Sequence, residues 1–207
     1  MRAGALTKTS AGNTLTIDTN LQRQAEDLLL LVKLGLATIP VVIGGLLAKD
    51  FIAAELRTIP IIATTTLLFA GALWTSDRRP GTGTHIGWSA AAMIGLAQML
   101  ALIPGTSRSG VTITAALFLG LSRVTAARFS FLLAIPTIAG AQLLLTWDLL
   151  TGSEVADVWH MTGGAVLAGI SAYAGIHFFI QLVERTGMLP YVIYRLALGA
   201  VLLIWFV

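Results

Sequence analysis

The sequence predicts an all-α fold: a polytopic bundle of membrane helices that contains one re-entrant, broken helix pair. Of the 207 residues, 56% are hydrophobic and only 11% are charged, whereas about a quarter of the residues in soluble domains are charged. The mean hydropathy is +0.85, and several apolar runs approach the roughly 20 residues that a helix needs to cross the hydrocarbon core. Two further apolar runs meet at a polar turn, and the second of them is too short to cross alone.

The composition divides the chain into a polar N-terminal arm, residues 1–27, and a membrane domain, residues 28–207. The arm mixes Thr, Asn, Gly and Ser with basic residues and has no apolar core of signal-peptide length. We therefore expect residues 1–24 to form a loop or a frayed surface arm, without a cleavable signal. The apolar runs of the membrane domain predict spanning helices at residues 28–48, 58–75, 129–147, 161–183 and 190–207.

A further apolar stretch is broken in the middle. Residues 86–103 stop at Pro104 and Gly105, and residues 111–121 continue as a segment that is too short to cross the bilayer alone. Half-helices that meet at a polar turn are tolerated at membrane depth only where their free backbone groups face protein or a watery cavity, and membrane proteins place binding sites there. We expect a re-entrant hairpin at about residues 86–121, with its turn as the first candidate site.

The charged residues predict how the chain is oriented, because Lys and Arg gather on the cytoplasmic side of membrane proteins. Residues 148–160 contain three acidic residues and no Lys or Arg, so we expect them outside. The residues expected inside are Arg78, Arg79, Arg123, Arg128 and Arg185. Both expectations hold only if the hairpin enters and leaves on the same face. Because the basic residues stand singly or in pairs at the ends of apolar runs, the net charge of +3 indicates membrane topology and no nucleic acid partner.

The turn of the expected hairpin carries the motif PGTSRSGVT at residues 104–112. Arg108 stands there among the hydroxyls of Ser107, Ser109 and Thr112, in an apolar region where an unpaired arginine is costly. Its planar guanidinium suits bidentate contact with phosphate oxygens, and the amides that open the following helix add unpaired donors. The motif therefore predicts a phosphate ester or diphosphate as ligand, against the alternative that Arg108 only snorkels or neutralises a helix end.

Other polar residues are weaker candidates. His177, inside the 161–183 span, is a candidate base, but a hydrogen bond within the bundle is the more common role of such a histidine. His85 and His160 fall in expected loops. Arg195, in the last span, is expected to snorkel or to pair with a helix terminus. The chain has no cysteine, which excludes disulfides, thiolate metal ligands and cysteine nucleophiles.

The motif and its flanking segments resemble a known family. PGTSRSGVT is preceded by IGLAQMLALI at residues 94–103 and followed by FSFLLAIP at residues 129–136, and the last span contains the stretch Tyr191 to Arg195. This arrangement resembles the undecaprenyl-diphosphatases, the bacitracin-resistance phosphatases, from about Leu28 to the C-terminus. The resemblance implies a multi-pass protein of the bacterial cytoplasmic (inner) membrane. Such a protein removes one phosphate from undecaprenyl diphosphate, which regenerates the lipid carrier for peptidoglycan synthesis and confers resistance to bacitracin.

The resemblance also implies roles for the motif residues. Arg108 would be catalytic by holding the diphosphate and stabilising charge in the transition state, and Ser107 by acting as nucleophile or orienting hydroxyl. Gln98 stands where the family's other repeat carries glutamates, and is a candidate for lining the site. The implied phosphate-binding set is Gly105, Thr106, Ser107, Arg108, Ser109, Gly110 and Thr112.

Part of the family's pattern is not found before Leu28. Relatives carry an earlier inverted repeat with a Glu-x-x-x-Glu motif and a Ser-Ser-Thr-Gly-His turn, which bind a divalent cation (Mg²⁺ or Ca²⁺) and supply a histidine. The adjacent Glu26 and Asp27 lack that spacing, so the cation is implied as a cofactor without assigned ligands. Two alternatives stay open: a lipid-carrier translocase or transporter, because broken helices also build transporter sites, and a truncated, catalytically incomplete family member. A homo-oligomer is left open as well.

Overall fold

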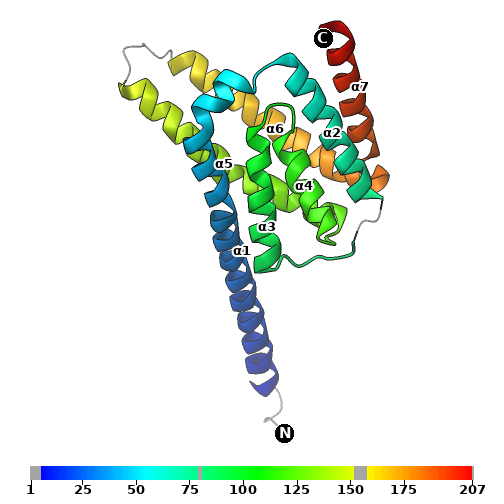
Figure 1. Cartoon of the computed structure of the whole chain (residues 1–207). Helices are drawn as coiled ribbons and strands as arrows, with labels where there is room; N and C mark the ends of the chain where they lie inside the picture. The colour runs from blue at the N-terminus through cyan, green and yellow to red at the C-terminus, as the bar shows by residue number, and fades with distance from the viewer. Residues whose placement is uncertain (1–5, 79–80, 152–157, 207) are drawn as a thin grey trace.

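Helices account for nearly all of the chain that the structure describes. The computed structural model describes residues 6–78, 81–151 and 158–206 (Figure 1). Within these residues, five helices are long and apolar enough to cross a membrane: α1, α2, α5, α6 and α7. The expected all-α, polytopic membrane bundle is thereby confirmed. In chain order the elements are α1 (Leu6–Glu55), α2 (Ile59–Asp77), α3 (Trp88–Gln98), the 3₁₀ helix η1 (Met99–Leu102), α4 (Arg108–Phe118), α5 (Arg123–Thr151), α6 (Val158–Thr186) and α7 (Leu189–Phe206).

Parts of two segments that were expected to be loops are helical. α1 begins at Leu6 and continues through Pro40, so the expectation of a loop is wrong for residues 6–24, whereas residues 1–5 lie outside the described residues. Once the apolar run is helical, each further residue adds a backbone hydrogen bond, and no proline before Pro40 stops the helix. The expected loop at residues 148–160 is also shorter, because α5 ends at Thr151 and α6 begins at Val158. His160 is therefore helical, and residues 152–157 lie outside the described residues.

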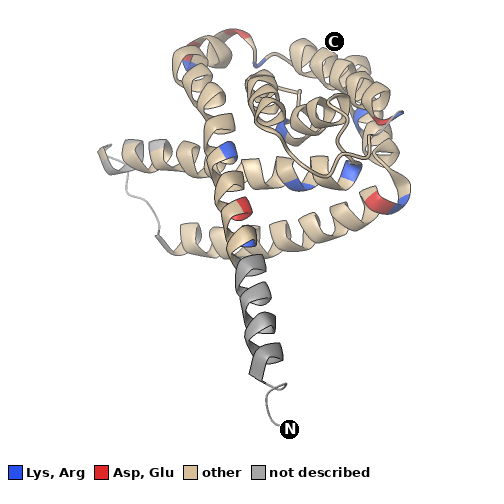
Figure 2. Ribbon diagram, turned by 90° about the horizontal axis from the view of Figure 1, so that it is seen from below, with Lys and Arg blue, Asp and Glu red and all other residues tan. Residues whose placement is uncertain are grey.

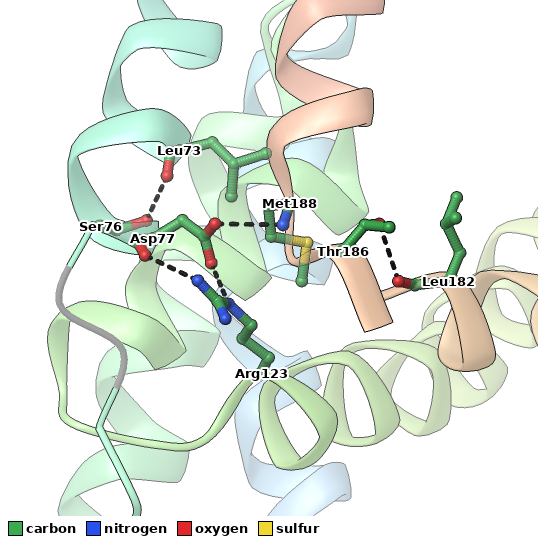
Figure 3. A network of polar contacts seen from close by, with 7 residues as sticks. All are labelled: Leu73, Ser76, Asp77, Arg123, Leu182, Thr186 and Met188. Atoms are coloured by element: carbon green, nitrogen blue, oxygen red, sulfur yellow. Dashed lines mark hydrogen bonds and ion pairs between the residues drawn. The ribbon is translucent and has the colours of Figure 1, made fainter. Parts of the chain in front are cut away.

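Three helix ends meet at one end of the bundle (Figure 3). Asp77, the last residue of α2, accepts from the side chain of Arg123 at the start of α5 and from the amide of Met188, just before α7. A cavity of about 220 Å³ lies beside Arg123. None of the residues that line it belongs to the 104–112 motif: they are Gly81, Ser122, Arg123, Val124, Val183 and Glu184.

Three of the five basic residues expected on one membrane face lie at helix ends near the Asp77–Arg123 pair, whereas Arg79 lies outside the described residues. Arg78 follows α2, Arg123 begins α5 and Arg185 lies in the last turn of α6, and Figure 2 marks the Lys and Arg positions along the described chain. The bond from Asp77 to Met188 places the end of α2 beside the α6–α7 junction. These helix ends therefore lie at the same end of the bundle, so that their basic residues can lie on the same side of the membrane.

α3, η1 and α4 form the helical hairpin, drawn in green in Figure 1. Its outer ends lie side by side, because the amide of Gly83 before α3 donates to the carbonyl of Gly120 after α4 over 3.1 Å. Its turn, residues 103–107, contacts Thr66 and Arg195, which lie near the middle of α2 and α7. The eleven residues of α4 measure about 16 Å at 1.5 Å per residue, roughly half the thickness of the hydrocarbon core.

The α4 arm of the hairpin is mostly enclosed by protein, whereas α6 is not. Most of α4 is buried, and α3 packs tightly on α1, since a Cβ on Gly95 would lie 2.6 Å from the Cα of Ala37. Every residue of α6 from 161 to 178 is exposed, and the edge-to-face contact of Phe179 with Phe131 on α5, at 5.4 Å between ring centroids, marks where its packing begins. An exposed apolar helix of this kind is suited to contact with lipid.

Candidate phosphate-binding site

The turn between η1 and α4 has an unusual backbone that its sequence explains. Ile103 is extended, with φ −78° and ψ 122°, as expected of a residue that precedes proline. Gly105 has φ +92°, a conformation that glycine adopts without steric cost. Ser107 has φ +64° although it is not glycine, and such strained residues are concentrated at functional sites.

The carbonyl oxygens of the turn are held by side chains of α2 and α7. Thr65 donates its hydroxyl to Pro104 O over 2.6 Å. Arg195 donates Nη2 to Gly105 O over 2.7 Å and Nη1 to Thr106 O over 2.8 Å. Arg195 is only 3% exposed, and these bonds to backbone carbonyls account for its place in an apolar span. The expectation that Arg195 snorkels is wrong, and its carbonyl partners belong to the turn before α4 and not to a helix terminus.

The start of α4 presents hydrogen-bond donors and hydroxyls in one place. Ser107 is the N-cap, and its Oγ accepts from the amide of Gly110 over 3.4 Å. The same Oγ lies 3.5 Å from Ser109 Oγ and 2.9 Å from the hydroxyl of Tyr191 on α7. The first amides of a helix have no partner within the helix, and they carry its positive dipole end. Such a terminus binds anions.

Arg108 adds a full positive charge to this terminus. It is the first residue of α4 and is partly buried. Its Nη1 is buried without a hydrogen-bond partner among the described residues. Because a buried, unsatisfied donor is costly and guanidinium groups match phosphate oxygens, the side chain is suited to receive an anion. The expectation that Arg108, Ser107 and Ser109 gather at one helix terminus agrees with this geometry.

The other predicted phosphate-binding residues take part in the fold. Gly105 and Gly110 allow close packing, since a Cβ on Gly110 would lie 2.8 Å from Arg195 Nη1. Thr106 is fully buried and donates its hydroxyl to Ile103 O over 2.8 Å. The hydroxyl of Thr112 lies 2.6 Å from Ser130 Oγ on α5. Contacts of the Thr106 and Thr112 side chains with phosphate stay a prediction, and in this structure both hydroxyls bond to the protein.

The remaining candidates lie away from the turn or face other elements. Gln98 is fully buried and donates Nε2 to Thr137 on α5 over 3.3 Å; its role in lining the site stays a prediction. His177 lies on the exposed part of α6 with its ring bonded to Gln181. His85 is exposed in the segment before α3. The structure therefore does not bring either histidine to Ser107.

Sequence reasoning left Tyr191 and Arg195 out of the site. Both contact the turn, and they are four residues apart on α7, which places them on the same helix face. The signal available was this spacing together with an arginine in an apolar span, where ionisable residues are functional by default. The packing of α7 against the hairpin could not be predicted from the sequence, because these contacts join residues 84 or more positions apart.

The described residues do not fit a divalent cation. Among the described residues there is no group of three or more His, Cys, Asp or Glu side chains that could hold a metal ion. Mg²⁺ and Ca²⁺ are bound through several oxygen ligands, usually including carboxylates. The divalent cation implied by the family resemblance stays a prediction.

The fold and the site define a multi-pass membrane protein whose central helical hairpin ends in an arginine- and serine-containing turn. Over residues 5–201 the sequence matches the family described as "Bacitracin resistance protein BacA". The chain is also 54% identical, over 187 residues, to an "Undecaprenyl-diphosphatase" of Alcanivorax borkumensis; the match covers 89% of this chain and 71% of that relative. The chain belongs to the BacA bacitracin-resistance family.

Proposed function

We propose that this protein hydrolyses undecaprenyl diphosphate to undecaprenyl phosphate and inorganic phosphate. The observation that carries the proposal is Arg108, a partly buried arginine with an unpartnered Nη1 at the start of α4, beside the hydroxyl of Ser107. Membership of the family and the similarity to an undecaprenyl-diphosphatase support the same activity. In the bacterial cytoplasmic membrane this reaction recycles the lipid carrier for peptidoglycan synthesis, and it confers resistance to bacitracin.

The side chains at the turn perform separable tasks in this reaction. Arg108 and the first amides of α4 bind the terminal phosphate and stabilise the negative charge that spreads over its oxygens in the transition state. In this proposal the hydroxyl of Ser107 attacks the phosphorus or orients the attacking water. The net reaction consumes one water, breaks the bond between the bridging oxygen and the terminal phosphorus, and releases undecaprenyl phosphate and inorganic phosphate.

The hairpin is re-entrant in this proposal, so that its turn meets the lipid head group within the depth of the membrane. Support comes from its two outer ends, which are joined at Gly83 and Gly120, and from its turn, which contacts the middle of α2 and α7. A backbone turn at that depth needs protein partners for its polar groups. Thr65, Thr66 and Arg195 provide such partners to the carbonyls of the turn.

The test is phosphate release from undecaprenyl diphosphate by the purified chain in lipid vesicles, measured with and without added Mg²⁺ or Ca²⁺. We expect Arg108→Ala to lower kcat/KM by about 10²- to 10³-fold, as for loss of one donor to a transition-state oxyanion. Arg108→Lys should recover part of this loss, because it keeps the charge without the planar fork. Arg185→Ala, which removes an exposed arginine of α6, is the matched control.

Two results would count against the proposal. Lipid movement between leaflets without phosphate release would identify a translocase, and full phosphate release by Arg108→Ala would remove Arg108 from the site.

A further inference from the structure

Two side chains of α7 act on opposite ends of the same short turn. Tyr191 places its hydroxyl 2.9 Å from Ser107 Oγ. One helical turn later, Arg195 donates to the carbonyls of Gly105 and Thr106. The backbone immediately before Ser107 and the side chain of Ser107 are therefore both bonded to one face of α7.

The bond to Thr106 O has a consequence for the amide that follows it. In a trans peptide the carbonyl and the N–H point in opposite directions, and the described chain has no cis peptide bond. Because Arg195 holds Thr106 O toward α7, the N–H of Ser107 points away from α7. A backbone N–H that is turned away from α7 can contribute a donor to an anion-binding site.

The two arginines near the turn therefore differ in what they are free to bind. Arg195 is 3% exposed, and both its terminal nitrogens donate to backbone carbonyls, so that only its Nε is without a partner among the described residues. Arg108 has a terminal nitrogen without a partner. Arg195 shapes the turn, whereas Arg108 is left to receive the ligand.

Tyr191 is itself held in place on both sides. Its ring meets Phe179 of α6 edge to face, with 6.1 Å between the centroids and 88° between the planes. The guanidinium carbon of Arg195 lies 5.9 Å from the centroid of the same ring, within the range of a cation–π contact. A ring fixed by two neighbours gives its hydroxyl a defined position relative to Ser107.

We propose that Tyr191 and Arg195 are positioning residues: Arg195 sets the backbone of the turn, and Tyr191 orients the Ser107 hydroxyl for reaction. The effect on turnover rests on the proposed phosphatase function. The orientation of the side chain at position 107 does not depend on that function. The positioning role and the phosphatase function can therefore be tested separately.

The first experiment measures position 107 directly and needs no activity. Because the chain contains no cysteine, Ser107→Cys introduces a single thiol, whose pKa is read from the pH dependence of its alkylation rate. Adding Tyr191→Phe removes a donor that stabilises the thiolate, so we expect the thiol pKa to rise by about one unit, a tenfold change in ionisation. Tyr194→Phe is the matched control, because Tyr194 lies on the same helix but is 61% exposed. An equal thiol pKa in the Tyr191 and Tyr194 variants would overturn the inference.

The second experiment follows phosphate release from undecaprenyl diphosphate by the otherwise unaltered chain. We expect Tyr191→Phe to lower kcat about five- to tenfold with KM within about twofold, as for loss of one hydrogen bond that matters in the transition state. Arg195→Lys should retain more activity than Arg195→Gln, since it keeps a charged donor to the turn carbonyls. If the Tyr191→Phe and Tyr194→Phe variants have the same kcat, the positioning role of Tyr191 is contradicted. Absence of turnover in every chain, the unaltered one included, would count against the proposed function, and the thiol pKa would then decide the positioning role alone.

Discussion

Asp77 and Arg123 form an ion pair in which Arg123 Nε lies 2.6 Å from Asp77 Oδ1. The same carboxylate accepts the amide of Met188 at Oδ2 over 3.1 Å, and Arg123 Nη2 donates to the Asp77 carbonyl over 3.1 Å (Figure 3). One carboxylate thus joins the end of α2, the start of α5 and the start of α7. Gly187, with φ +71°, packs against both charged groups, and a Cβ there would lie 3.0 Å from Arg123 Cζ.

Asp77→Asn should destabilise the protein without abolishing activity. The asparagine keeps an acceptor for Met188 but loses the charge opposite Arg123. Because the side chain of Asp77 is 11% exposed and that of Arg123 is 34% exposed, we expect a loss of about 1–2 kcal/mol, between the values for surface and buried pairs. The measurement is the thermal unfolding midpoint in detergent, with Glu184→Gln as an exposed carboxylate control. Equal midpoints for the two variants would show that the pair contributes nothing.

Ser107 provides a test of backbone strain. At φ +64° glycine is tolerated better than alanine, so Ser107→Gly should be more stable than Ser107→Ala by about 1 kcal/mol although both lack the hydroxyl. Two residues later, inside α4, the order should reverse, and Ser109→Ala should be more stable than Ser109→Gly by up to about 1 kcal/mol. The four unfolding midpoints are compared in detergent. The same order at both positions would contradict the left-handed backbone at Ser107.

The helices and the site turn could be predicted from the sequence because their causes are local. Apolar runs of spanning length define the five long helices, and the proline and glycine at 104 and 105 stop one run in the middle. The motif itself predicts a helix N-terminus with Arg108 and two serines. These features depend on residues within a few positions of one another.

The partners of the turn could not be predicted, because they come from packing between distant segments. Tyr191 and Arg195 stand in the last apolar span, and only the packing of α7 against the hairpin shows that both contact the turn. Thr112 belongs to the phosphate-binding set through its place in the motif, and its contact with Ser130 on α5, 2.6 Å between the two oxygens, could not be foreseen from the sequence. The helical start of α1 was missed for another reason, since polar composition does not prevent a helix from extending out of an apolar run.

Gly105 should not tolerate a side chain. Its φ of +92° disfavours any Cβ, and a Cβ there would overlap Thr65 Oγ1 and Ile62 O on α2. We expect Gly105→Ala to lower the free energy of unfolding by about 2 kcal/mol or more and to reduce phosphate release at permissive temperature. Gly169→Ala is the control, because on α6 nothing lies within 4 Å of the added Cβ. Equal midpoints and equal activities in the two variants would refute the packing of the turn against α2.

Thr112→Val separates a structural hydroxyl from a phosphate ligand. The hydroxyl lies 2.6 Å from Ser130 Oγ, and both residues are buried. Its removal takes away the hydrogen-bond partner of Ser130, which should lower the free energy of unfolding by about 1–3 kcal/mol. We expect the unfolding midpoint to fall while KM for undecaprenyl diphosphate stays within about twofold. Ser130→Ala in the same chain should restore part of the stability, because removing both partners of a buried hydrogen bond costs less than removing one. A raised KM at an unchanged midpoint would instead identify Thr112 as a ligand of the phosphate, as its place in the motif predicts.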